Sequence, residues 1–162
     1  MLELITIVEV NDALAEMVAF FRVELRSYKG LVSKPNVDAG REEMEEYLAA
    51  GFPVFAAMVD GQYAGYVVCR VDSEVVWVES VFVKEEYRRH GVASALHSKA
   101  EEIAAFYGED TVYNYVHPNN HRMLEFLRKR GYTVLNLIEI RKPFKGEKLT
   151  QTITVGEHEF DY

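Results

Sequence analysis

The sequence has 162 residues, of which 49% are hydrophobic and 27% charged, and this composition is typical of one soluble globular domain. A formal net charge of −8 disfavours a nucleic-acid partner and suits a cationic substrate such as a polyamine or a lysine. No apolar run approaches the ~18 residues of a membrane span. The lone Cys69, without any zinc-type Cys/His spacing, excludes an internal disulfide and predicts no metal site and a reducing, cytoplasmic compartment.

The first fifty residues predict a strand, a helix, a loop and a second helix. Residues 2–8 are β-rich, and Asn11-Asp12 offers an N-cap for the helix that follows. We expect a loop at 29–40 and a short acidic helix at 41–50. The apolar side chains of the first helix share one face: Leu14, Met17, Val18, Phe21 and Leu25.

Three strands are predicted next. Runs at 54–59 and 63–71 are separated by Asp60-Gly61, a strong two-residue hairpin signal. Residues 75–83 are almost continuously apolar, which indicates a central strand buried on both faces. The acid within this strand, Glu79, therefore stands out.

The rest of the chain predicts a strand–helix–strand ending and a tail. The expected elements are a helix at 91–107, a strand at 111–116, a turn at 117–120, a helix ending at Gly131 and a strand at 132–141. A strand-like stretch at 149–155 is expected to pair with the sheet edge or with a partner chain, and the second option would make a homodimer.

The segment before the helix at 91–107 is basic where an acid is expected. A helix N-terminus carries partial positive charge, yet the sequence here is Arg88-Arg89-His90-Gly91-Val92-Ala93-Ser94. A bound anion would resolve the conflict, and backbone N–H groups beside the small Gly91 and Ala93 suit a pyrophosphate. Alternatively, the arginines are solvated or paired with Glu85 and Glu86, and Gly91 only provides a turn.

Two motifs resemble those of the GCN5-related N-acetyltransferase (GNAT) family. Arg88, Gly91 and Ala93 match its Arg/Gln-x-x-Gly-x-Gly/Ala motif, and the segment from Asn120 to Tyr132 resembles its second motif, an Asn, a helix, then Gly and an aromatic residue. The resemblance covers about residues 2–141. It implies an α/β fold with a mixed, mostly antiparallel central sheet flanked by helices, whose splayed parallel strands form the acyl-CoA site. We expect one domain over 1–162, with a core at about 2–141 and a tail at about 143–162.

The resemblance also implies which residues bind acetyl-CoA, the expected cosubstrate. The family's central strand pairs with pantetheine through its backbone, here Val81, Phe82 and Val83, and Asn120 would contact the same arm. A bulge in that strand would free the N–H group that this needs. The residues that would hold the pyrophosphate follow Arg88 in the loop and first helical turn: Arg89, His90, Gly91, Val92, Ala93 and Ser94.

Glu79 is the candidate general base. An amine with a pKa near ~10.4 is protonated at neutral pH and must lose a proton before it can attack a thioester. Glu79 lies within the central strand, where a carboxylate could accept that proton. The alternative is a paired strand carboxylate without a catalytic role.

The sequence departs from the family where a general acid is expected. Leu127 stands at the position of the family's tyrosine. A thiolate is a fair leaving group even without protonation, because a thiol pKa is near ~8.5. Other groups could supply the proton instead: Tyr113, Tyr115, His117 or Tyr132.

The sequence thus predicts an N-acetyltransferase that acts by direct attack in a ternary complex, with a small-molecule or protein amine as acceptor. Two alternatives are open. The chain could be a non-catalytic acyl-CoA sensor, which the missing tyrosine would favour, or a protein-interaction domain that uses the acidic helix or the tail.

Overall fold

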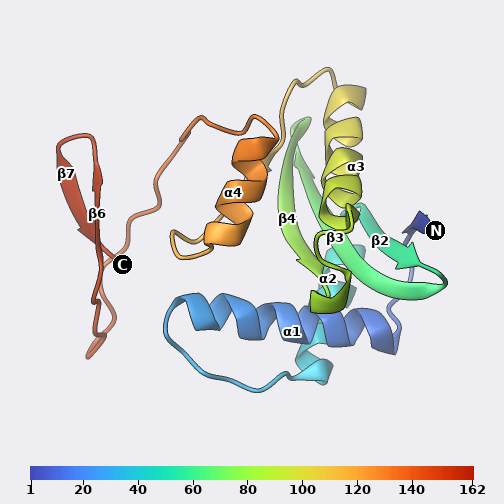
Figure 1. Cartoon of the computed structure of the whole chain (residues 1–162), viewed down its shortest axis with the longest axis horizontal. Helices are drawn as coiled ribbons and strands as arrows, with labels where there is room; N and C mark the ends of the chain where they lie inside the picture. Colours follow the sequence, from blue (N-terminus) through green and yellow to red (C-terminus); the bar gives the residue numbers. More distant parts are fainter. The chain divides into compact units, whose positions relative to one another are not determined.

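The computed structural model describes residues 1–162, and the chain divides into two compact units, Met1–Tyr115 and Val116–Tyr162 (Figure 1). The expectation of a single domain over the whole chain stays a prediction.

The first unit is built on a five-stranded sheet in the order β1-β2-β3-β4-β5. Its first four strands are antiparallel, whereas β5 runs parallel to β4 and pairs with it only at Trp77↔Tyr113 and Val78↔Asn114. This confirms the predicted mixed, mostly antiparallel sheet. The strands are β1 Leu2–Thr6, β2 Val54–Val59, β3 Gln62–Asp72, β4 Val75–Val83 and β5 Tyr113–Asn114.

Helices cover both faces of this sheet. The helical elements of the unit are α1 Asp12–Tyr28, α2 Val37–Ala49, the 3-10 turn η1 Glu85–Tyr87 and α3 Val92–Phe106. On one face, the ring of Phe21 in α1 lies 6.5 Å from that of Tyr66 and 6.4 Å from that of Phe82, in a core to which α2 adds Met44. Val83 points to the opposite face because side chains alternate along a strand, and α3 packs there.

Helix α2 begins four residues before the predicted start at 41. Asn36 is its N-cap and accepts a hydrogen bond from the N–H of Ala39 at 3.0 Å. Gly40 therefore lies inside the helix, where a Cβ would come within 2.3 Å of the carbonyl oxygen of Ala15 in α1. This glycine, which suggested a loop in the sequence, allows two helices to pack closely.

The second unit contains α4 His121–Lys129 and a hairpin of β6 Thr152–Val155 and β7 His158–Asp161. Asn120 caps α4 as predicted. The tail strand pairs with the last residues of the chain instead of with the sheet edge.

The predicted strand at 132–141 is wrong, because these residues form no strand in the structure. Val134 and Leu137 are 87% and 83% exposed. β-propensity measures how well a side chain fits a pleated, half-buried surface. Residues 132–141 have β-type side chains, but no neighbouring strand pairs with their backbone, so propensity alone does not make them a strand.

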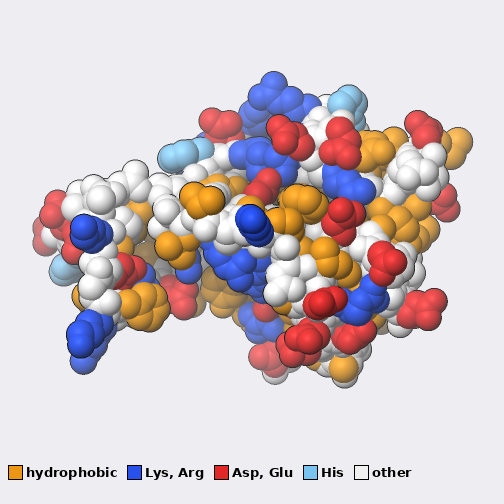
Figure 2. Space-filling view, turned by 90° about the horizontal axis from the view of Figure 1, so that it is seen from below, with side chains coloured by type: hydrophobic (Ala, Val, Ile, Leu, Met, Phe, Trp, Pro, Cys, Tyr) orange, Lys and Arg blue, Asp and Glu red, His pale blue; other side chains and the backbone are white.

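The surface agrees with the acidic composition. Figure 2 shows Asp and Glu side chains interspersed with Lys and Arg, with hydrophobic side chains between them. No helix in the structure has both the length and the apolar character that crossing a membrane requires.

Candidate functional site

The N-terminus of α3 differs from that of the other long helices. Asparagine side chains cap α1, α2 and α4, namely Asn11, Asn36 and Asn120. Helix α3 begins instead at Gly91, with no side-chain cap and no acid in its first turn. The first N–H groups of a helix have no partner inside it. The N–H groups of residues 92–94 are therefore available to an anion.

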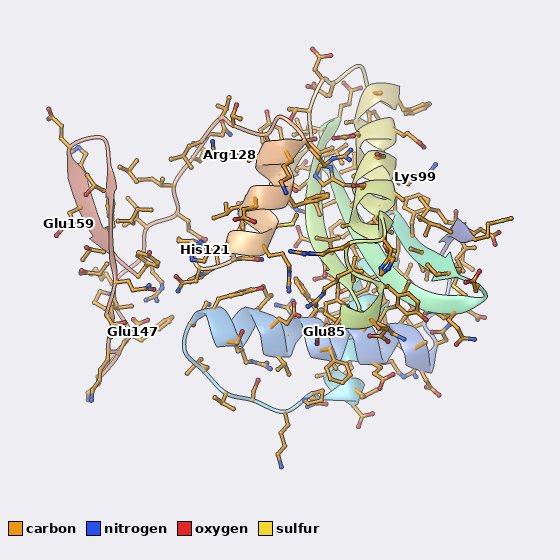
Figure 3. The ribbon with its side chains drawn as sticks, viewed as in Figure 1. Glu85, Lys99, His121, Arg128, Glu147 and Glu159 are labelled. Carbon is orange, nitrogen blue, oxygen red and sulfur yellow. The ribbon has the colours of Figure 1, made fainter.

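The loop before α3 has an unusual backbone. Gly91 has a φ of 80°, and Arg89 has a φ of 63°, a region that costs a non-glycine residue about 1 kcal/mol or more. A Cβ on Gly91 would meet no protein atom within 4 Å, so the space in front of this turn is open. The side chains of Arg89 and His90 are exposed. Glu85, labelled in Figure 3, lies just before this loop in η1.

Arg88 anchors the loop. Its Nε donates to the carbonyl oxygen of Val83 at 2.8 Å, and its Nη2 forms an ion pair with Glu24 in α1. Its guanidinium also lies 5.7 Å from the ring centroid of Phe82. The arginine is thus paired with Glu24 and not with Glu85 or Glu86. Its side chain fixes the start of the loop to the end of β4.

One edge of β4 is open within the first unit. On the β3 side the ladder runs through Val81↔Val67, Phe82↔Tyr66 and Val83↔Gly65, whereas on the β5 side pairing ends at Val78. The two parallel strands therefore separate at this point. The backbone between residues 79 and 83 has no strand beside it on the β5 side, apart from the Val83 carbonyl that Arg88 occupies.

A bulge in β4 determines where Glu79 points. Val68 pairs with Ser80, and the next residue, Cys69, pairs with Val78, so Glu79 is the extra residue. Ser80 faces the α1 side, where its hydroxyl lies 2.8 Å from that of Tyr66. Regular alternation would turn Glu79 to the α3 face, but the bulge brings it to the α1 and α2 face. The bulge thus lies at Glu79 and not at residues 81–83, where the sequence predicts it.

Glu79 is half-buried and paired with an arginine of the neighbouring strand. Nε of Arg70 donates to Oε2 of Glu79 at 2.9 Å, and the side chains are 26% and 29% exposed. The guanidinium lies 4.2 Å from the ring centroid of Trp77. Partial burial acts to lower the pKa of Arg70, but the hydrogen bond and the charge of Glu79 outweigh it, so the pKa is raised.

A second cluster of hydrogen-bonded polar side chains lies between α1 and α2. Nε of Arg22 donates to Oε2 of Glu43 at 2.6 Å, and the hydroxyl of Tyr47 donates to Oε1 of Glu43 at 2.6 Å. Burial, then the bond to Glu43, raises the pKa of Tyr47, and Glu79 is near enough to contribute to the rise. These residues are not among the site residues that the sequence predicts. Helical spacing could have found one pair, because Glu43 and Tyr47 are four residues apart.

The candidate proton donors have varied surroundings. The ring of Tyr113 lies 5.5 Å from that of Trp77, which is a packing contact. Tyr115 is 71% exposed. In the second unit, Nδ1 of His117 accepts a hydrogen bond from the N–H of Asn119 at 3.1 Å, and Leu127 is buried.

No group of three or more His, Cys, Asp and Glu side chains is arranged to hold a metal ion.

Comparisons with known proteins agree with this geometry. Residues 16–132 match the model of the acetyltransferase (GNAT) family, which is more than half of the chain. The fold resembles that of AAC(6')-Iy in complex with the bisubstrate analogue CoA-S-monomethyl-acetylneamine, at 21% identity and a TM-score of 0.65 over 89% of this chain and 99% of that one. It also resembles the PaiA N-acetyltransferase of Thermoplasma acidophilum in complex with coenzyme A, at 16% identity and a TM-score of 0.65 over 80% and 88%.

A third similar structure is the aminoglycoside 6'-N-acetyltransferase AAC(6')-Ih of Acinetobacter baumannii. It is 16% identical, with a TM-score of 0.62 over 89% of this chain and 99% of that one. At these identities the likeness shows the fold.

Proposed function

The chain belongs to the GNAT acetyltransferase family, and on this premise we propose that it transfers an acetyl group from acetyl-CoA to a primary amine by direct attack in a ternary complex. One observation carries the proposal: the open end of β4 leads, through η1 and one short loop, to the uncapped N-terminus of α3. The helix N-terminus suits a pyrophosphate and the open strand end suits a peptide-like arm.

The pyrophosphate would be held by backbone N–H groups. We assign this to the loop and first turn, which comprise Arg89, His90, Gly91, Val92, Ala93 and Ser94. The helix dipole favours a negative charge here, and the exposed guanidinium of Arg89 adds to the field. Arg88 serves by holding the loop in place through Val83 and Glu24.

The pantetheine arm would pair with the backbone of β4 between Val81 and Val83. Its amides require hydrogen-bond partners, and the unpaired edge of β4 offers them. A strand N–H beside the thioester would stabilise the oxyanion that forms there, a contribution of ~3 kcal/mol to the barrier. Asn120 caps α4 in the second unit, and its contact to the arm stays a prediction from the sequence.

Glu79 would accept the proton of the attacking amine. The nitrogen then bonds to the thioester carbon, the carbon–sulfur bond breaks, and coenzyme A leaves as a thiolate. The thiolate takes up, directly or through solvent, the second proton that the nitrogen loses as it becomes an amide. Position supports this role, because the bulge turns the carboxylate toward the α1 and α2 face beside the open edge. This chemistry belongs in a reducing compartment such as the cytoplasm, which also suits the free Cys69.

A small-molecule amine is the acceptor that we propose to test first. One structure with this fold contains an analogue that joins CoA to acetylneamine, and another is described as an aminoglycoside 6'-N-acetyltransferase. Neamine, spermidine and a lysine-containing peptide therefore form the first panel.

The test is thiol release from acetyl-CoA with each amine, for the wild-type chain and Glu79→Gln. We expect turnover with at least one amine, and a fall in kcat of about 10²-fold or more in the variant, because general-base catalysis contributes that much. The affinity for acetyl-CoA should not change. Glu43→Gln is a matched control that removes a carboxylate from the same face without touching β4.

Each other outcome identifies an alternative. Acetyl-CoA binding without turnover would make the chain a sensor. If no CoA species binds, the protein-interaction domain becomes the better account. Undiminished turnover in Glu79→Gln would support the acetyltransferase activity but contradict the role of Glu79 as its base.

A further inference from the structure

The guanidinium of Arg70 is held on three sides. Glu79 accepts its Nε–H at 2.9 Å, the ring of Trp77 lies 4.2 Å from its central carbon, and Tyr115 is close enough to contribute to its raised pKa. Arg70 and Trp77 are directly opposite each other in the β3–β4 ladder. The bulge at Glu79 places all three side chains on one face.

This arrangement orients a carboxylate more than it stabilises the fold. An ion pair that water still reaches contributes little to stability, about 1 kcal/mol or less when it is fully exposed, and both side chains here keep about a quarter of their surface exposed. A planar guanidinium stacked on an indole has little freedom to turn. The carboxylate that it binds therefore has a fixed position beside a positive charge.

We propose that Arg70 is a positioning residue for the base: held against Trp77, it fixes the Glu79 carboxylate at the bulge and keeps it ready to accept a proton from the amine. The inference rests on the proposed function. It adds a residue from β3 to the reaction and explains why the base lies beside a cation instead of in an apolar pocket.

The charged and titratable groups that face Glu79 come from several elements. Arg70 comes from β3, Tyr115 follows β5 and contributes through Arg70, and Tyr47 comes from α2. The hydroxyl of Tyr47 donates to Glu43, and Arg22 from α1 donates to the same carboxylate. Arg70 is the cation in direct contact with Glu79. Its removal should therefore change the position of the carboxylate more than any other single substitution.

The experiment measures kcat and KM for wild type, Arg70→Gln and Arg70→Lys, with the amine from the panel that reacts fastest. In Arg70→Gln kcat should fall by about tenfold or more, because the carboxylate loses the contact that fixes its position. Arg70→Lys keeps the charge without the planar stack. It should recover only part of kcat, with KM for acetyl-CoA unchanged in both variants.

Arg141→Gln is the matched control. Arg141 also pairs with a glutamate, Glu147, and stacks at 4.3 Å on an aromatic ring, that of Phe144, but it lies outside residues 16–132. It should leave kcat and KM unchanged. An unchanged kcat in Arg70→Gln, or an equal fall in the control, would overturn the inference alone. If the wild-type chain acetylates no amine, that result would contradict both the proposed function and this inference.

Discussion

Two glycines at opposite ends of α3 allow a sharp test of the phosphate site. Gly91 and Gly108 have φ values of 80° and 82°, and a Cβ on either would meet no protein atom within 4 Å. Glutamate at either position therefore adds a similar backbone strain of about 1–2 kcal/mol. The helix dipole favours a carboxylate at the N-terminus and disfavours it at the C-terminus by about 0.3–1 kcal/mol. Gly108→Glu should thus be at least as destabilised as Gly91→Glu.

Binding should separate the two variants. A carboxylate at position 91 would occupy the open space before the first turn and repel a pyrophosphate. The loss of even two hydrogen bonds to a charged group, at about 1.5–3 kcal/mol each, weakens binding by about 10²-fold or more. We expect this loss in isothermal titration of acetyl-CoA into Gly91→Glu, and wild-type affinity in Gly108→Glu. Equal affinities in the two variants would refute the assignment of the site.

Two further predictions concern stability. Gly40→Ala should lower the free energy of unfolding by about 1–3 kcal/mol in urea denaturation, since its Cβ would come within 2.3 Å of the Ala15 carbonyl; a stability equal to wild type would contradict the close packing of α1 and α2. Burial raises the pKa of Cys69 to about 12, so a thiol reagent at pH 8 should not react until the chain unfolds. The unfolded chain can ionise this thiol above about pH 8.5, whereas the folded chain keeps it protonated up to about pH 12. The free energy of unfolding should therefore be unaffected by Cys69 below about pH 8.5 and should fall by about 1.4 kcal/mol per pH unit between these two values. Cys69→Ala lacks the thiol, so its free energy of unfolding should not show this fall. Parallel pH profiles of the free energy of unfolding for wild type and Cys69→Ala would contradict the prediction.

Local signals in the sequence were sufficient for most elements of the first unit. The hairpin turn at Asp60-Gly61, the cap at Asn11 and the apolar run at 75–83 each occur where the structure has the expected element. Each depends on neighbouring residues alone. The strand at 132–141 depended on a partner strand, and no such strand pairs with it.

The arrangement of the site was less accessible from the sequence. The spacing of residues identified Glu79 and Gly91, but the partner of Glu79 depends on the β3–β4 register and on the bulge. Neither leaves a pattern in the sequence, so Arg70 was not found. The same holds for Arg88, whose partner Glu24 is 64 residues away. Long-range pairs of this kind follow from the packing of α1 on the sheet.

The most direct test of the central claim is a single-turnover reaction with acetyl-CoA labelled in its acetyl group, with products identified by mass spectrometry. Direct attack predicts that the label moves to the nitrogen of the amine and that none is found on the protein. Label that stays on coenzyme A with every amine in the panel would contradict acetyl transfer, and label on a protein side chain would contradict the ternary-complex mechanism.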